Sequence, residues 1–145
     1  MIRVVLADDH GVIRDGLCEL FAAEPGIEVI GVASDGVAAT ELIERLEPDI
    51  AILDLMMPGL NGLEVTRELS LWYPHIRFIV LSMYHDEAYV REALRNGAAA
   101  YCLKQNCVEE VVDAVNSVAA GKRYFGANIP RGLMKEYGED IDPPH

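Results

Sequence analysis

The sequence predicts an α/β fold, a doubly wound parallel sheet of five strands with helices on both faces. Three observations carry this prediction: five strand-sized apolar runs recur along the chain, segments with helical periodicity lie between them, and capping or turn residues mark the junctions. Apolar runs without polar alternation are typical of strands that are buried on both faces. Right-handed crossovers leave few topologies open for such a sheet.

The expected strands and helices alternate along the chain. The strands are VVLA at 4–7, VIGVA at 29–33, IAIL at 50–53, FIVL at 78–81 and AAYCL at 99–103. Helical spacing of apolar residues is seen at Ile13, Leu17, Leu20 and Phe21, at Ala39, Leu42, Ile43 and Leu46, and at Val111, Val112, Val115, Val118 and Ala119. In a parallel sheet of this kind the site lies beyond the carboxyl ends of the strands.

Capping residues predict where several helices begin and end. Asn61 precedes Glu64 by three positions, and the same spacing follows Asn106, so both are near-matches to a capping box. The pair Asn96-Gly97 is a stop signal for the helix before it. After Gly121 the pattern weakens, so we expect one domain over residues 1–121 and a linker over 122–145, with a short helix around 131–137.

Charge and composition restrict the class of protein. The net charge of -12 over 145 residues disfavours contact with nucleic acid or anionic lipid, because both need Lys and Arg. The three cysteines lack metal-ligand spacing, nothing at the start resembles a secretory signal, and no apolar run approaches the roughly 18 residues that span a bilayer. We therefore expect a cytoplasmic chain that binds neither DNA nor membrane by itself.

Three carboxylates follow predicted strands. Asp8 and Asp9 come after the first strand and Asp54 ends the third, so a parallel sheet brings all three to one edge. Carboxylates so close repel one another, and a divalent cation relieves the repulsion. Mg²⁺ suits a site with few protein ligands, several waters and a phosphate.

A hydroxyl and an ammonium are expected at the same edge. Ser82 ends the fourth strand and Lys104 follows the fifth, and both groups can hold phosphoryl oxygens. A carboxylate nucleophile that forms an acyl phosphate, with Mg²⁺ and lysine balancing the charge, is a known arrangement in phosphoryl transfer. Each residue alone has an ordinary explanation, because Asp54 after a strand is commonly a turn former and a lone lysine is commonly solvated.

Four stretches together resemble the receiver domain of two-component response regulators: VVLADDH, AILDLMMPGLNG, IVLSMY and GAAAYCLK. The resemblance covers about residues 2–120, and it is specific because the acid pair, the acceptor aspartate, the hydroxyl and the lysine occur in order. It implies a flavodoxin-like sheet with strand order 2-1-3-4-5. It also implies a phosphoryl-accepting switch rather than an enzyme, with at most self-catalysed phosphotransfer and autodephosphorylation.

By this resemblance Asp54 is the phosphoacceptor. Asp8, Asp9, Asp54 and the main-chain carbonyl of Met56 are implied to surround Mg²⁺. His10 and His85 also lie near strand ends, but without metal-ligand spacing, and we expect them to be solvated loop residues.

The remaining site residues are carried over in the same way. Lys104 is implied to contact the phosphoryl group, Ser82 to be the switch hydroxyl, and Tyr101 to be the aromatic residue that responds to it. One departure from the family is Gln105 after the lysine, where many receivers have proline, so the sequence leaves the geometry of this loop open.

The stretches DDHGVIRDGL, SMYHDEAYV and AGKRYF further resemble the NarL/FixJ subfamily, whose members usually carry a C-terminal helix-turn-helix domain. We expect a truncated chain, in which a sensor histidine kinase or a small acyl phosphate supplies the phosphoryl group. The expected output is a shift in conformation and homodimerisation that controls transcription, with DNA bound by the C-terminal domain of the full-length protein.

Three other functions make different demands on the sequence. A receiver-like interaction module that is independent of phosphorylation needs the fold alone. A haloacid-dehalogenase-like phosphatase needs a second acid two residues after the nucleophile, where this chain has Met56. A flavodoxin-like FMN carrier needs a Ser/Thr/Gly loop after the first strand, where ADDHG is acidic.

Overall fold

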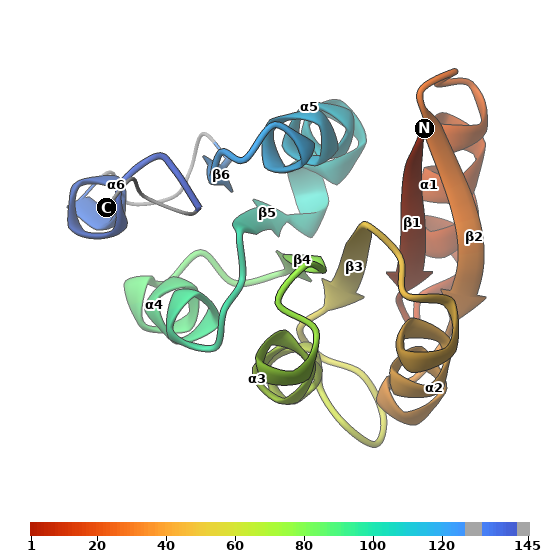
Figure 1. Cartoon of the computed structure of the whole chain (residues 1–145), viewed down its shortest axis with the longest axis horizontal. Helices are drawn as coiled ribbons and strands as arrows, with labels where there is room; N and C mark the ends of the chain where they lie inside the picture. Colours follow the sequence, from red (N-terminus) through yellow and green to blue (C-terminus); the bar gives the residue numbers. More distant parts are fainter. Residues whose placement is uncertain (127–131, 142–145) are drawn as a thin grey trace.

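The computed structural model describes residues 1–126 and 132–141. These residues form one parallel sheet of six strands in the order β2-β1-β3-β4-β5-β6 (Figure 1). The predicted parallel α/β fold and the order of its first five strands are confirmed. The sixth strand was not predicted.

The strands are β1 (Ile2–Ala7), β2 (Ile27–Ala33), β3 (Ile50–Asp54), β4 (Arg77–Ser82), β5 (Ala100–Leu103) and β6 (Tyr124–Phe125). The helices are α1 (Gly11–Ala22), α2 (Gly36–Leu46), α3 (Gly62–Trp72), α4 (Glu87–Arg95), α5 (Cys107–Ala119) and α6 (Gly132–Tyr137), and a 3-10 turn, η1 (Lys104–Asn106), precedes α5. None of the described helices is long and apolar enough to cross a bilayer.

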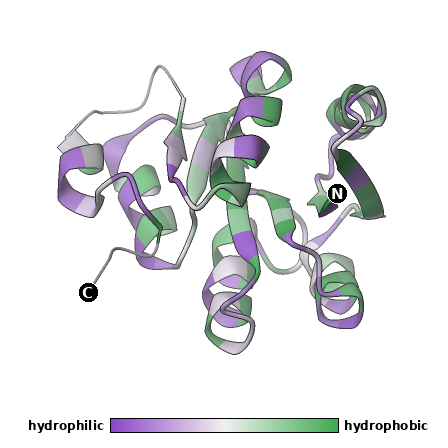
Figure 2. Ribbon diagram, turned by 45° about the horizontal axis from the view of Figure 1, so that its top comes forward, coloured by the Kyte–Doolittle hydropathy of each residue, from purple (hydrophilic) through white to green (hydrophobic). Residues whose placement is uncertain are grey.

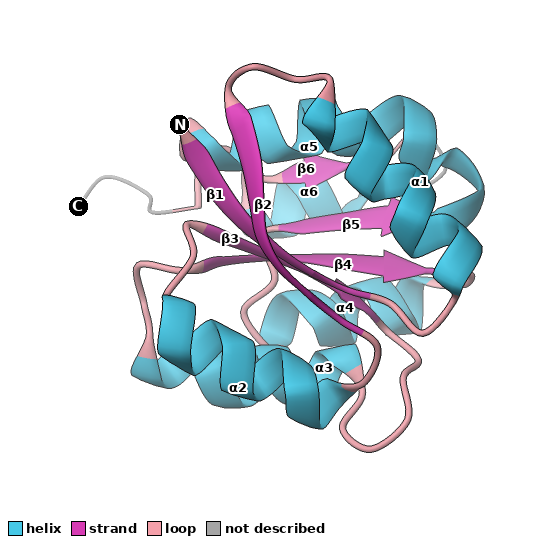
Figure 3. Cartoon of the chain, turned by 90° about the vertical axis from the view of Figure 1, so that its right-hand side faces the viewer, coloured by secondary structure: helices cyan, strands magenta, loops and turns pink. Residues whose placement is uncertain are grey.

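Helices cover both faces of the sheet. Figure 3 shows α1 and α5 on one face and α2, α3 and α4 on the other. The face under α1 and α5 has one apolar cluster, the opposite face has two, and every residue of β3 is buried between them. Hydrophobic colour is concentrated on the central strands in Figure 2, and burial of apolar area at about 25 cal/mol per Å² is what holds the layers together.

The two expected capping boxes differ in outcome. Asn61 caps α3 as predicted, since its side chain accepts from the Glu64 amide at 2.9 Å and its own amide donates to the Glu64 carboxylate at 3.2 Å. Asn106 makes no side-chain cap, so that prediction is wrong. The reason is local: Asn106 ends η1, and its φ of -113° and ψ of 3° are not the extended conformation of an N-cap.

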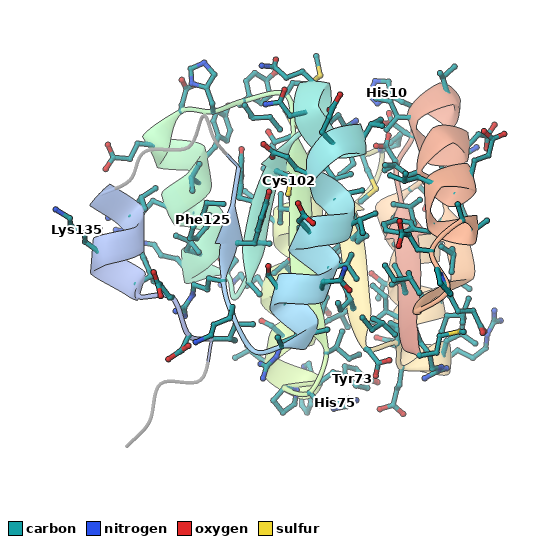
Figure 4. The ribbon with its side chains drawn as sticks, turned by 90° about the horizontal axis from the view of Figure 1, so that it is seen from above. His10, Tyr73, His75, Cys102, Phe125 and Lys135 are labelled. Carbon is teal, nitrogen blue, oxygen red and sulfur yellow. The ribbon has the colours of Figure 1, made fainter. Side chains whose placement is uncertain are left out.

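The described part of the segment after Gly121 packs on the sheet edge instead of leaving the domain. β6 pairs with β5, placing Tyr124 opposite Ala100 and Phe125 opposite Tyr101. In α6 Leu133 is 1% exposed and joins the cluster around α4 and β5. Figure 4 shows Phe125 on β6, while Lys135 of α6 points away from the sheet. The expected short helix is thus confirmed, and it is packed onto the domain.

Candidate functional site

The register of the sheet brings the predicted site residues together. Ala7 pairs with Leu53, so Asp8 and Asp54 each lie one residue further along neighbouring parallel strands. Ser82 pairs with Leu103, and the next residue is Lys104. All of these side chains therefore lie at the carboxyl edge of the sheet, as the sequence predicted.

Asp54 is held by the turn that follows β3. Its side chain is 3% exposed, and its Oδ1 accepts from the Met56 amide at 3.2 Å. Gly62 starts α3 against this turn, where an added Cβ would lie 2.4 Å from the Asp54 carbonyl oxygen. Only glycine permits that approach, which explains part of the run AILDLMMPGLNG that surrounds the carboxylate.

Lys104 joins the two buried carboxylates. Its Nζ lies 2.7 Å from Asp54 Oδ2 and 3.2 Å from Asp8 Oδ1, and its side chain is 2% exposed. The lysine is therefore not a solvated surface residue. The described residues contain no cis peptide bond, so the Lys104-Gln105 bond is trans.

The pocket holds more negative than positive charge. Burial raises the pKa of Asp54 to about 6, the hydrogen bond from Lys104 opposes this shift, and the charge of Asp8 adds to it. Asp8 is fully buried, and its Oδ2 is one of the few buried side-chain atoms of the described residues without a hydrogen-bond partner. A buried carboxylate oxygen without a partner is costly, and a bound cation would compensate it.

The carboxylates are arranged to share one ion. Asp8, Asp9, His10 and Asp54 each offer a ligand atom, and these atoms all lie within 4.8 Å of one another. Oxygen atoms of this kind are the donors that Mg²⁺ takes. The donor set therefore fits a divalent cation.

Sequence reasoning missed His10. It is an exposed loop residue as expected, but its Nδ1 also lies 3.2 Å from both Asp8 Oδ1 and Asp9 Oδ1 and 2.7 Å from Lys104 Nζ, contacts that the expectation did not include. Figure 4 shows His10 beside the start of α1. The His10 amide donates to Asp8 Oδ1 at 2.8 Å, an Asx turn that the Asp-x-His spacing could have indicated.

Arg14 was also missed. Its guanidinium donates to the Asp8 main-chain carbonyl at 2.9 Å, one turn into α1, and so fixes the loop that carries the acids. His85 is exposed as expected.

Ser82, at the end of β4, and Tyr101, on the neighbouring strand β5, both contact Tyr84 in the loop after β4. The Ser82 hydroxyl accepts from the Tyr84 amide at 2.9 Å, and the Tyr101 hydroxyl donates to the Tyr84 carbonyl at 2.6 Å. Burial raises the pKa of Tyr101 to about 12, and a hydrogen bond with Ser82 opposes the shift. The loop after β4 is thus tied to both residues.

Met56 presents no acid to the site. Its side chain is 51% exposed, and its described contact with Asp54 is made by the main-chain amide. The position at which a haloacid-dehalogenase-like phosphatase needs its general acid therefore carries a thioether.

The comparisons with known proteins agree with this fold. A family model for the response regulator receiver domain matches residues 4–116. Transcriptional regulatory protein DegU of Brevibacillus brevis is 40% identical over 136 residues, which are 94% of this chain and 58% of DegU. The chain thus spans less than two thirds of that relative's length.

Two solved structures are similar over most of the chain. The signal receiver domain of NarL from Mycobacterium tuberculosis is 37% identical with a TM-score of 0.80, covering 83% of this chain and 98% of that one. A LuxR-family response regulator from Aurantimonas sp. is 32% identical with a TM-score of 0.86, covering 96% and 99%.

The family match and the relatives define a signalling switch domain rather than a classical enzyme. The chain belongs to the response regulator receiver-domain family of two-component systems, and is of the NarL/FixJ type.

Proposed function

We propose that Asp54 accepts a phosphoryl group from the phosphohistidine of a sensor kinase or from a small acyl phosphate. The observation that carries this proposal is the contact of Lys104 Nζ with Asp54 Oδ2 at 2.7 Å, beside the buried and partly unpaired Asp8. The Asp54 carboxylate is thus paired with the Lys104 ammonium, which can also stabilise the negative charge of the phosphoryl oxygens after transfer.

In this reaction an Asp54 oxygen forms a bond to phosphorus while the bond from phosphorus to the donor breaks. The electron pair of that bond leaves with the donor, which takes up a proton when it is an imidazole. Lys104 and the Ser82 hydroxyl are proposed to hold phosphoryl oxygens. Any autodephosphorylation would be the attack of water on the same phosphorus, which breaks its bond to the Asp54 oxygen, restores the carboxylate and releases inorganic phosphate carrying the protons of the water.

The metal is proposed to be Mg²⁺, held by Asp8, Asp9, Asp54 and the main-chain carbonyl of Met56. When bound, it would offset the charge of the carboxylates and of the phosphoryl oxygens. The buried Oδ2 of Asp8 supports this assignment, because the described residues offer it no hydrogen-bond partner.

The response to phosphorylation is proposed to run from Ser82 to Tyr101. Movement of the Ser82 hydroxyl toward a phosphoryl oxygen would break its hydrogen bond with the Tyr84 amide. The carbonyl of Tyr84 accepts from the Tyr101 hydroxyl at 2.6 Å, so a shift of Tyr84 would also disturb Tyr101. The aromatic ring would then change position within the cluster around α4 and β5. Such a two-state element shifts its populations when a ligand favours one state.

For the full-length protein we propose homodimerisation, a cytoplasmic location and control of transcription through a C-terminal helix-turn-helix domain. The relative DegU is called a transcriptional regulatory protein, and this chain covers 58% of its length, which supports the proposal. We propose residues 1–121 as the receiver domain and 122–145 as a connecting segment whose described part packs back on β5 and α4.

The test is the intact mass of the chain after incubation with acetyl phosphate and Mg²⁺. One added phosphoryl group is expected, and chelation of the metal should prevent it. Asp54→Ala should gain nothing, whereas Asp113→Ala, which removes an exposed carboxylate of α5, should behave as the wild type. Equal labelling of wild type and Asp54→Ala would refute the proposal.

A further inference from the structure

His10 is more than half exposed to solvent, yet its ring contacts the pocket formed by Asp8, Asp9 and Asp54. Its side chain is 55% exposed, yet Nδ1 lies 3.2 Å from Asp8 Oδ1, 3.2 Å from Asp9 Oδ1 and 3.7 Å from Asp54 Oδ2. The ring is positioned by its own main chain, since the His10 amide donates to Asp8 Oδ1 at 2.8 Å and α1 begins at the next residue. The imidazole therefore lies beside all three carboxylates.

The spacing of these atoms matches a shared ion. Neighbouring donors of an octahedral ion with bonds of about 2.1 Å lie about 3.0 Å apart. The two 3.2 Å separations of Nδ1 from Asp8 and Asp9 are close to that edge, and the four donor atoms lie within 4.8 Å of one another. Opposite donors of such an ion lie about 4.2 Å apart, so binding would draw the four atoms slightly closer together.

A second observation points to a cation at this place. Asp8 is fully buried, and its Oδ2 has no hydrogen-bond partner among the described residues. Lys104 reaches the other oxygen, Oδ1, at 3.2 Å. The Lys104 ammonium thus pairs with Oδ1 and leaves the negative charge on the buried Oδ2 of Asp8 without a positive partner.

We propose that Nδ1 of His10 is a further protein donor to the cation held by Asp8, Asp9 and Asp54. This inference rests on the proposed metal site and adds a nitrogen ligand to it. Imidazole nitrogen favours first-row transition ions, whereas Mg²⁺ favours oxygen and retains water. The ratio of Mn²⁺ affinity to Mg²⁺ affinity should therefore be higher in this pocket than in one formed by the same carboxylates without His10.

The contact with Lys104 is consistent with this role. Nδ1 lies 2.7 Å from Lys104 Nζ, and because an ammonium has no lone pair, Nδ1 is the acceptor. The same lone pair would bind the ion. Coordination by His10 would then leave the hydrogens of Lys104 for Asp54 and the phosphoryl group.

The test uses the whole chain loaded with Mn²⁺ and compares wild type, His10→Ala and His75→Ala. His75 is a matched control, since its side chain is 59% exposed and contacts Glu47 rather than the pocket. Pulsed electron paramagnetic resonance should detect coupling of Mn²⁺ to an imidazole nitrogen in wild type and His75→Ala, and none in His10→Ala. Calorimetry should show His10→Ala losing about tenfold or more in Mn²⁺ affinity, with a much smaller loss for Mg²⁺.

Each other result has a definite meaning. Mn²⁺ binding without nitrogen coupling, at equal affinity in the three proteins, would overturn the inference, leave the proposed metal site intact and make His10 a positioning residue for Lys104. Equal losses of Mn²⁺ and Mg²⁺ affinity in His10→Ala would overturn the proposed preference. Failure of the wild type to bind either ion would overturn both this inference and the metal site on which it rests.

Discussion

Lys104 Nζ lies 2.7 Å from Asp54 Oδ2, although β4 separates their strands in the sheet. The contact is possible because β3, β4 and β5 are parallel and end at one edge, so that residues fifty positions apart in the chain meet there. One ammonium is shared between Asp54 and Asp8. The described pocket therefore holds three carboxylates and one ammonium.

Lys104→Met should slow phosphorylation of Asp54 by acetyl phosphate by about 100-fold, the usual cost of removing one group that stabilises developing charge. Methionine keeps the length of the side chain and removes the ammonium. The rate of mass increase with Mg²⁺ present measures the effect. Lys122→Met is the control, because that lysine is 54% exposed and pairs with Asp140. Equal rates in the two variants would contradict the role of Lys104.

Asp54→Asn should raise the melting temperature at pH 7.5 in the presence of a chelator. Burial raises the folded-state pKa of Asp54 from 3.8 to about 6, so the folded chain holds this proton more tightly than the unfolded chain does. The resulting stability is full below pH 4 and is lost as the pH rises through 6, which leaves a destabilising ionised carboxylate at pH 7.5. The neutral amide avoids this cost.

The advantage of Asp54→Asn should therefore shrink as the pH falls from 6 to 4 and disappear about one pH unit below 3.8, where the wild-type carboxylate is protonated in both states. Thermal melts across about pH 3 to 8 provide the comparison. Asp113→Asn controls for the loss of one acidic charge from an exposed position. A variant less stable than the wild type at pH 7.5 would show that Lys104 outweighs burial and Asp8.

Tyr101→Phe should lower the free energy of unfolding by about 1 kcal/mol, because the Tyr84 carbonyl loses the hydrogen bond of 2.6 Å that it accepts. The ring itself is retained, so the core should stay packed. Urea unfolding measures the change, and Tyr73→Phe, whose tyrosine is only partly buried, is the comparison. No loss in Tyr101→Phe would mean that water replaces the phenol.

Leu133→Ala should destabilise the packing of the segment after Gly121. Leu133 is 1% exposed, and large-to-small changes at such positions cost about 2–5 kcal/mol. Because the contact holds α6 on the cluster that contains Tyr101, hydrogen exchange should accelerate first in β6 and α6. Leu71→Ala, at a leucine that is 79% exposed, should leave exchange unchanged. Unaltered protection in Leu133→Ala would argue against this packing.

The site could be predicted largely from the sequence because strand ends and residue chemistry define it. Asp54 and Lys104 each follow an apolar run, and parallel pairing is enough to bring them together. His10 could not be placed by periodicity, because a local Asx turn folds it back onto Asp8. The conformation of Asn106 likewise depends on the 3-10 turn that ends there.

Strand β6, at the edge of the sheet, could not be predicted from hydrophobic periodicity either. β6 has two residues, too few for an alternation to be recognised, and it exists because β5 offers a free edge with which to pair. Arg123 then donates to the main-chain carbonyls of Tyr137 and Asp140, both at 2.6 Å. Such long-range contacts leave no local signal in a sequence.

The central claim is that one carboxylate, Asp54, carries the phosphoryl group. After phosphorylation, borohydride reduction converts an aspartyl phosphate to homoserine, and peptide mass spectrometry identifies the position. The account predicts homoserine at residue 54 and unmodified aspartate at residues 8 and 9. Homoserine at either of those two positions, or phosphate recovered on His10, would contradict it.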